Sequence, residues 1–495
     1  MRPGPTIAAL ALAAAATAQT PALDAAAAAM GGKERVLGVR TLVLEGAGTN
    51  LNFGQNYTPA AETRFDVTSY KRSYDFVNRR WLLDQARVPA FTTANMSPQR
   101  QRQGMDGAAG GIAFNVSPTD VMQRVGGAAA SDRAHEFLYH PVGFLISAYQ
   151  PGAAVTEEAG PGNTRVVVLS AGDQRFRMVV DGRSGLPIRI ERPTYQAMLG
   201  DVMLINEFAD WAESGGVRLP MRITQRYENL FTLSAYQLTG SAVNADVGNI
   251  GASDSIRALP PPGPQAVPAP PTIVVDSLAP GVWLIAGQTH HTVAIEQQNQ
   301  LVLVEAPQSE ARTLAAIEAA RGLRPGKAPT VVINTHHHFD HAGGFRAAVS
   351  QGLSVVTQRG NRDFYERIVF PRKHTMNRDE LARNPKPLRL TAVGDRHVMR
   401  DSMRTIEIHH VPNPHNGAML VVYLPMERML VQADLYNPPA NPPAAGAPAP
   451  VFPFVASLVD AVQKAGLQVD RVVGIHGRPV AYSELQSAAA ANRAP

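Results

Sequence analysis

Three histidines at metal-ligand spacing and one aspartate lie close together in the C-terminal half of the chain. Residues 336–341 read His-His-His-Phe-Asp-His. Because alternate side chains of an extended segment point to opposite sides, His336 and His338 can share one metal ion while His337 points away. Asp340 and His341 can then turn toward a neighbouring position. Imidazole and carboxylate ligands without thiolate suit Zn²⁺ best, with Fe and Mn as alternatives.

The strand expected before this segment places the histidines at an edge of a sheet. Residues 330–334 are Thr-Val-Val-Ile-Asn, a β-branched and apolar run that is typical of a buried strand. The histidines would follow its carboxyl end, where open α/β sheets bind ligands. Gly343 and Gly344 allow a close turn of the backbone beneath them. The alternative interpretation is a histidine-rich surface loop that binds no ion.

The segment resembles the H-x-H-x-D-H motif of the metallo-β-lactamase superfamily, whose fold is a four-layer αββα sandwich. The resemblance implies three further ligands downstream, each next to a strand. His415 precedes the apolar run 418–424, Asp434 ends the run 429–434, and His476 ends the run 471–477. The resemblance covers about residues 271–485, which is under half of the chain.

The resemblance also implies how the ligands divide between two metal ions. The first site would contain His336, His338 and His415, and the second site would contain Asp340, His341 and His476. Asp434 would bridge the two ions. Taken alone, a histidine after a strand is more often a structural residue.

Two cations held about 3.5 to 4 Å apart make hydroxide available, because bound water then ionises near a pKa of about 7. Asp340 would orient this bridging hydroxide, and hydrolysis is the expected reaction. The bridging aspartate makes the site resemble those of glyoxalase II, lactonases, phosphodiesterases and sulfatases more than those of β-lactamases, so an ester, thioester, lactone, phosphoester or sulfate is the expected substrate. An iron-dependent sulfur dioxygenase is an alternative with the same ligand pattern.

Several neighbouring features bear on the substrate. His409 and His410 lie on the strand before His415 and are interpreted as structural or rim residues. His290 and His291 follow a turn that should border the active-site groove and are candidate substrate contacts. The segments 436–454 and 365–378 could each cover the groove, or could be surface excursions. Many members of the superfamily have aspartate where this chain has Glu305, which leaves the contacts behind the metal site open.

We predict an α+β protein with two domains. Residues 1–18 resemble a secretory signal peptide, with an alanine-rich disordered terminus as the alternative. An N-terminal β-rich domain would span 22–257, a proline-rich linker 258–271, and the metallo-β-lactamase-like domain 272–490. Strands are expected at 281–287, 291–296 and 301–305, followed by a helix at 309–320.

The N-terminal half contains short alternating segments separated by glycine-containing turns, which predicts a curved antiparallel sheet. It loosely resembles periplasmic lipoprotein-carrier domains, which implies a possible role in binding a lipid or a membrane surface. A hydrophobic-ligand carrier that uses the metal domain as a scaffold is therefore a second hypothesis. The glycine- and glutamine-rich residues 98–127 are expected to form a loop.

The amino-acid composition limits the binding partners and the kinds of metal ligand that we expect for this protein. The 495 residues include no cysteine, which excludes disulfides and thiolate ligands. The formal net charge is +5, but Lys and Arg are spread along the chain, so a nucleic-acid partner is not expected. With the leader sequence, these features predict a periplasmic or secreted enzyme acting on a small molecule.

Overall fold

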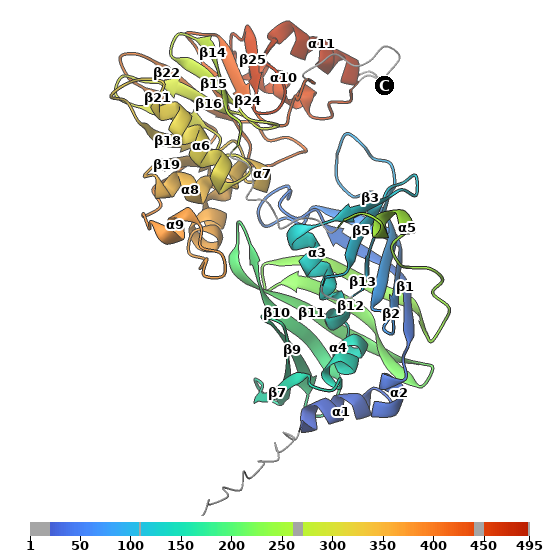
Figure 1. Ribbon diagram of the computed structural model, residues 1–495. Helices are drawn as coiled ribbons and strands as arrows, with labels where there is room; N and C mark the ends of the chain where they lie inside the picture. Colours follow the sequence, from blue (N-terminus) through green and yellow to red (C-terminus); the bar gives the residue numbers. More distant parts are fainter. Residues whose placement is uncertain (1–19, 108–109, 261–270, 440–449, 494–495) are drawn as a thin grey trace, which may run out of the picture.

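A computed structural model describes residues 20–107, 110–260, 271–439 and 450–493. The chain is mostly β and forms two bodies that lie end to end (Figure 1). We call residues 20–257 the sheet region and residues 271–493 the C-terminal region. The predicted signal peptide 1–18 and most of the predicted linker 258–271 lie outside the described residues.

The sheet region is built on one antiparallel sheet of thirteen strands. Strand β1 pairs with both β2 and β13, so that two meanders meet at the middle of the sheet. The predicted curved antiparallel sheet is present. Its strands are β1 (Thr41–Leu51), β2 (Arg64–Asp75), β3 (Arg80–Pro89), β4 (Gln99–Asp106), β5 (Ile112–Val116), β6 (Met122–Val125), β7 (Ala154–Ala159), β8 (Thr164–Ala171), β9 (Gln174–Asp181), β10 (Pro187–Gln196), β11 (Gly200–Ser214), β12 (Val217–Tyr227) and β13 (Phe231–Val243).

Short helices pack against the inner face of this curved sheet (Figure 1). Phe137, Phe144 and Leu145 from these helices are buried against sheet residues such as Leu44 and Trp81. The apolar face of the sheet is therefore covered by the chain itself. The helices of the sheet region are α1 (Pro21–Ala29), α2 (Lys33–Leu37), α3 (Gly127–Ala134), η1 (Glu136–Tyr139), α4 (Pro141–Ala148) and α5 (Asp254–Arg257).

The prediction of a loop at 98–127 is wrong, because this segment forms strands β4, β5 and β6. The run Gln-Arg-Gln-Arg-Gln at 99–103 is too polar to indicate a strand by itself. In the structure, β4 pairs with β3 along eight residues, and Met105 and Phe114 are buried beneath the sheet. Pairing with a neighbouring strand outweighs the weak local preference of polar residues.

The C-terminal region contains two sheets, of seven and six strands. Strands β17 to β20 run parallel to one another, as do β24 and β25. The first sheet consists of β14 (Val274–Ala279), β15 (Val282–Ala286), β16 (Thr292–Glu296), β17 (Leu301–Val304), β18 (Pro329–Ile333), β19 (Ser354–Gln358) and β20 (Leu390–Val393). The second consists of β21 (Arg396–Arg400), β22 (Thr405–His410), β23 (Leu420–Leu424), β24 (Met429–Gln432), β25 (Arg471–Gly474) and β26 (Val480–Ala481).

Three apolar cores show that these sheets pack in four layers. One core lies between the two sheets, a second joins the first sheet to α6 and α8, and a third joins the second sheet to α10 and α11. None of the helices in the described part of the chain has the length and apolar character needed to cross a bilayer. The helices are α6 (Glu310–Arg321), α7 (Phe339–Ala342), α8 (Phe345–Ser350), η2 (Arg359–Asn361), η3 (Phe364–Val369), α9 (Glu380–Arg383), α10 (Val455–Lys464) and α11 (Tyr482–Arg493).

The strands and the helix predicted around the metal segment are confirmed with small shifts of their ends. The predicted helix 309–320 is α6, and the Ser309 hydroxyl caps it by accepting a hydrogen bond from Arg312 N at 3.3 Å. Strand β14 was not predicted. It lies at an edge of the sheet and its first four residues are exposed, so its sequence lacks the apolar alternation of a half-buried strand.

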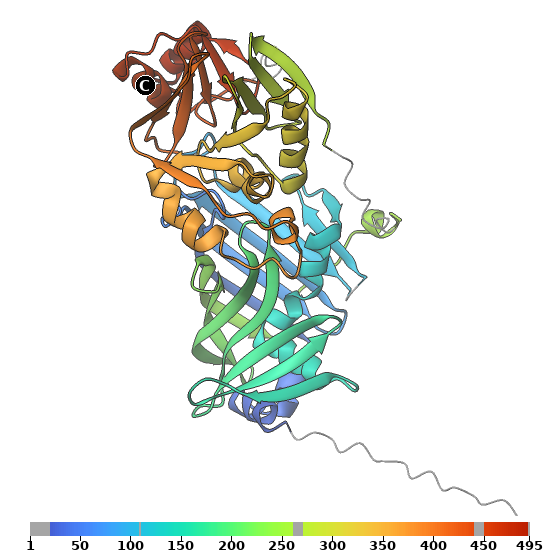
Figure 2. The same ribbon diagram turned by 90° about the vertical axis from the view of Figure 1, so that its left-hand side faces the viewer.

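The segment 365–378 contacts the sheet region rather than forming a free flap. Arg372 pairs with Glu228 at 2.8 Å, and Asp201 accepts hydrogen bonds from Thr375 N and Met376 N. Figure 2 shows this orange segment lying over the green strands. This ion pair and these hydrogen bonds therefore hold the two regions together.

Candidate metal centre

The metal-binding segment lies where strand β18 ends and the four-residue helix α7 begins. Gly344 comes two residues after this helix. It is closely packed, because a Cβ at this position would overlap with the side chain of Thr313. His415, Asp434 and His476 reach the same place from the loops after β22, β24 and β25. The structure brings two groups of potential ligand atoms together, each within 4.8 Å: His336, His338, His415 and Asp434, and His290, Asp340, His341 and His476.

Asp434 lies between the two groups. Its Oδ2 atom is 3.2 Å from His336 Nε2, 3.1 Å from His415 Nε2 and 2.9 Å from His341 Nε2. Its Oδ1 atom is 3.0 Å from His476 Nε2. One carboxylate thus contacts histidines of both groups, which is the position that a bridging ligand must occupy. Burial would raise the pKa of Asp434, but the neighbouring imidazoles hold it well below the ordinary value.

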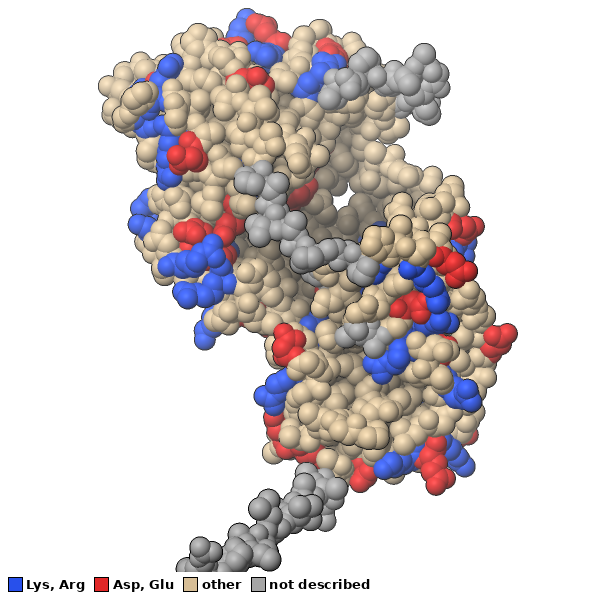
Figure 3. Space-filling view, viewed as in Figure 1, with Lys and Arg blue, Asp and Glu red and all other residues tan. Residues whose placement is uncertain are grey.

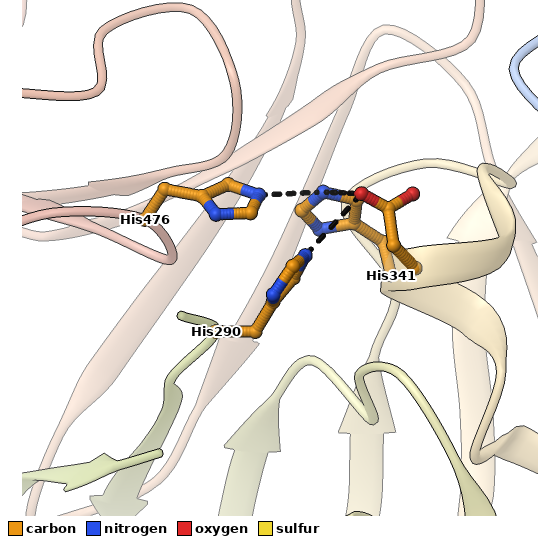
Figure 4. A group of neighbouring side chains, drawn as sticks. His290, His341 and His476 are labelled. Atoms are coloured by element: carbon orange, nitrogen blue, oxygen red, sulfur yellow. Dashed lines mark hydrogen bonds and ion pairs between the residues drawn. The ribbon is translucent and has the colours of Figure 1, made fainter. Parts of the chain in front are cut away.

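The second group includes one histidine more than expected from the sequence. His290 Nε2 lies 3.2 Å from Asp340 Oδ2, and the rings of His290 and His476 are 3.9 Å apart between centroids. His341 Nε2 is 3.1 Å from His476 Nε2 (Figure 4). His290, predicted as a substrate contact, therefore lies among the second group of potential ligands.

Three of the imidazoles, those of His336, His341 and His476, are oriented by hydrogen bonds from the ring nitrogen that faces away from the site. The Thr335 hydroxyl donates to Glu305 Oε2 at 2.5 Å, so it accepts from His336 Nδ1 at 3.0 Å. His341 Nδ1 donates to Glu305 Oε2 at 3.0 Å, and His476 Nδ1 donates to Thr289 O at 3.0 Å. Each of these three rings then presents the lone pair of Nε2 to the centre of the site.

His338 is oriented by the sheet region. Its Nε2 donates to the carbonyl oxygen of Asn56 at 2.9 Å, which leaves the lone pair of Nδ1 facing the site. Gln55, the preceding residue, donates from Nε2 to Asp340 Oδ1 at 2.7 Å. Neither residue could be predicted from the sequence, because nothing in the segment around 55 marks it as a neighbour of the metal motif.

Glu305 accounts for the departure from the pattern of the superfamily. Its side chain is fully buried and accepts hydrogen bonds from Thr335 N and Thr335 Oγ1 as well as from His341. Its φ is +79° and that of Asp434 is +62°, a region that non-glycine residues rarely adopt. Such backbone strain is often found at functional sites. The longer side chain of Glu305 thus reaches the metal-site imidazole from the end of β17.

The donor set fits divalent cations. Among the described residues, His338 Nδ1 is buried without a hydrogen-bond partner, and His336 Nε2 is buried with only the 3.2 Å contact to Asp434 Oδ2. Burial lowers the pKa of His336 to about 4 and that of His338 well below the ordinary value, so both rings are neutral, as metal ligands must be. Burial also disfavours a charge on His341, yet Asp434 and Glu305 raise its pKa well above the ordinary value. His341 thus holds a proton next to the carboxylates of Asp434 and Glu305. A bound metal ion would supply positive charge to these carboxylates in place of that proton.

The other histidines near the site have separate contacts. His337 contacts Asn416 Nδ2 at 3.2 Å, on the side away from the two groups. His291 Nε2 donates to Gly477 O at 3.0 Å, which ties the turn before β16 to the loop carrying His476. His409 contacts Glu407, and His410 donates to Gly417 O, as expected of structural residues.

Comparison with known proteins identifies the C-terminal region. The model of the metallo-β-lactamase superfamily matches residues 286–476. These residues form a metallo-β-lactamase superfamily domain. The presence of this domain supports a metal-dependent hydrolase. No curated protein matches the chain.

Three solved structures are similar to part of the chain. A metallo-β-lactamase from Pontibacter korlensis has 18% identity, with 45% of this chain and 100% of that chain covered and a TM-score of 0.35. A metallo-β-lactamase from Hirschia baltica has 19% identity, with 45% of this chain and 99% of that chain covered and a TM-score of 0.34. The metallo-β-lactamase FIM-1 from Pseudomonas aeruginosa has 17% identity, with 44% of this chain and 93% of that chain covered and a TM-score of 0.32.

Proposed function

We propose that the protein is an exported dinuclear zinc hydrolase that cleaves an ester, thioester, lactone, phosphoester or sulfate. The observation that carries this proposal is the position of Asp434 between two groups of histidines whose free lone pairs converge. His336, His338 and His415 would hold the first ion, and Asp340, His341 and His476 the second. Bound divalent cations supply a water that ionises near neutral pH and a positive field for negative charge developing on the substrate.

The protein's own residues hold the reacting groups in place. Asp340 accepts hydrogen bonds at both carboxylate oxygens, from Gln55 and from His290, so its orientation is fixed. A carboxylate held in this way can orient an attacking water and accept its proton. His290 lies beside Asp340, and burial, the largest influence, lowers its pKa, so the neutral ring holds the carboxylate in place through Nε2.

Metal analysis combined with a hydrolase panel tests this proposal. Protein prepared with zinc should contain two ions per chain and hydrolyse at least one of a thioester, a lactone, a phosphodiester, an aryl sulfate and nitrocefin. Asp340→Ala should lose this activity, while Asp363→Ala, at an exposed carboxylate on η3, should retain it. Equal activity in Asp340→Ala would refute the assigned role. Iron in place of zinc, with oxygen consumed on a persulfide substrate, would favour the sulfur dioxygenase instead.

Export is part of the proposal and rests on the leader-like residues 1–18. Amino-terminal sequencing of protein from the periplasmic fraction tests it, and a chain that still begins at Met1 would exclude cleavage.

The carrier hypothesis has less support than the enzyme. The apolar inner face of the thirteen-stranded sheet, which an acyl chain would need, is covered by Phe137, Phe144 and Leu145. The cavity that remains there has a volume of about 320 Å³ and is lined by polar side chains such as Arg72, His140 and Asn206. Lipid that co-purifies with the protein would favour the carrier.

A further inference from the structure

A cavity of about 560 Å³ opens beside the metal centre, at the boundary between the two regions. His415 and Asp434 form part of its wall, so a molecule bound there would contact the potential metal ligands. Asn52, Gln55 and Tyr57 line it from the loop after β1, as do residues 90–94 from the loop after β3. Figure 3 shows a hollow between the two bodies at this boundary.

The loop that forms this wall is fastened to the C-terminal region. Phe339 N donates to Gly54 O at 3.0 Å, and Gly417 N donates to Tyr57 O at 2.9 Å. The ring of Phe53 packs edge-on against that of Phe339, with centroids 5.0 Å apart. Together with the contacts of Gln55 and Asn56, these bonds place residues 53–57 along the metal segment. The wall is therefore a fixed part of the site.

Aromatic side chains from both regions line the cavity, among polar ones. Tyr57 and Phe91 lie on the side of the sheet region, and Phe452 and Phe454 lie on the side of the C-terminal region. Phe454 lies next to the first group of potential metal ligands, since its ring centroid is 5.0 Å from that of His415. Tyr57 and Val451 are 43% and 57% exposed, so apolar surface is available for a ligand to cover.

The charge of the cavity wall limits the substrate further. Within the described ranges, the lining contains neither lysine nor arginine. Glu62 is exposed on the wall and adds negative charge. Arg372, a basic residue at the boundary, is paired with Glu228. An anionic group on the substrate would thus meet repulsion and no cationic partner away from the metal ions.

We infer that the substrate is an uncharged ester or lactone with an aromatic or bulky alkyl group, and that the loop 52–63 of the sheet region selects it. This inference rests on the proposed hydrolase. The apolar part of the substrate lies between the four aromatic rings, with the scissile bond at the end lined by His415 and Asp434. Within the proposed substrate range, this favours esters and lactones over phosphoesters and sulfates.

Binding of a matched pair of probes to the full-length, metal-stripped protein tests the selection without hydrolysis. The probes are 4-phenylbutyramide and 4-phenylbutyrate, which differ mainly in charge, and ligand-observed NMR gives the dissociation constants. The amide should bind about tenfold more tightly. Glu62→Gln should reduce this ratio severalfold, whereas Glu34→Gln, at an exposed position on α2, should leave it unchanged.

Two results would overturn the inference: equal or tighter binding of the carboxylate, or no binding of either probe while circular dichroism shows a folded protein. Phe452→Ala should weaken binding of both probes alike, and unaltered binding in this variant would place them outside the cavity. The proposed hydrolase fails separately, through metal-loaded protein that hydrolyses no member of the panel.

Discussion

Gln55 Nε2 donates a 2.7 Å hydrogen bond to Asp340 Oδ1 across 285 residues of sequence. The bond joins a loop of the thirteen-stranded sheet to the carboxylate of the metal segment. The other oxygen of Asp340 faces His290, so the carboxylate is held from both sides. The sheet region therefore contributes to the geometry of the metal centre as well as to the wall of the cavity.

Replacing Gln55 by alanine should lower kcat/KM about 10- to 100-fold. A hydrogen bond to a charged group contributes about 1.5 to 3 kcal/mol, and about 1.4 kcal/mol corresponds to a factor of ten. The loss should fall mainly on kcat, because Asp340 is misoriented while most of the cavity is unchanged. Steady-state kinetics measures both constants. Gln237→Ala, at an exposed position on β13, serves as the control. A change in KM alone would assign Gln55 to substrate binding only.

Replacing Glu305 by glutamine should weaken metal binding about 10- to 100-fold, because residues that orient a ligating imidazole contribute about this much to metal affinity. The variant loses the carboxylate that accepts hydrogen bonds from His341 and Thr335. Competition with a chromophoric chelator gives the affinity. Glu318→Gln, on the exposed side of α6, should bind zinc as the wild type does. Wild-type affinity in Glu305→Gln would show that the carboxylate is dispensable.

Gly54 is required both for its backbone angle and for its contact with Phe339. Its φ is +79°, and a Cβ would lie 2.7 Å from the Phe339 ring. Gly162 has a φ of +61° and open space around the position of a Cβ. Each change to alanine should cost about 1 kcal/mol of unfolding free energy from the backbone angle. Only Gly54→Ala should also reduce hydrolysis, since it displaces the loop of Gln55. Equal activity of the two variants would contradict this role of the loop.

His140 should make stability depend on pH. Burial, with a smaller contribution from Arg72, lowers its pKa to about 3 in the folded protein, against about 6.5 when unfolded. Between these values the unfolded chain binds more protons, so the contribution of His140 is full above pH 6.5 and is lost as the pH falls toward 3. The free energy of unfolding should fall by up to about 1.4 kcal/mol per pH unit from this residue.

Urea denaturation of the wild type and His140→Asn at several pH values measures this dependence. Asparagine can keep the hydrogen bond from Val142 N at the start of α4 but does not titrate. The variant should show a smaller slope of stability against pH between 6.5 and 4. Identical slopes would mean that other groups cause the dependence.

The sequence by itself predicted the candidate metal ligands and the layered order of the C-terminal region, and the structure brings those side chains together. The segment 336–341, the apolar run after His415 and the runs that lead to Asp434 and His476 are local patterns. Parallel strands buried on both faces, such as β24 and β25, require such runs. The curved sheet was also predicted from alternation and turns. The strands at 99–125 were missed because a polar strand such as β4 is stabilised by its neighbours rather than by its own composition.

Only the tertiary structure decided which residues surround the ligands. Gln55 and the Asn56 carbonyl lie in a loop without a metal-binding pattern, and His290 and His291 are adjacent in sequence but face different partners. The contacts of Gln55 and Asn56 depend on how the sheet region docks against the C-terminal region. Those of His290 and His291 depend on how loops within the C-terminal region meet, and no local preference of the chain encodes either arrangement. A hydrogen bond between residues 285 positions apart forms only after both surfaces exist.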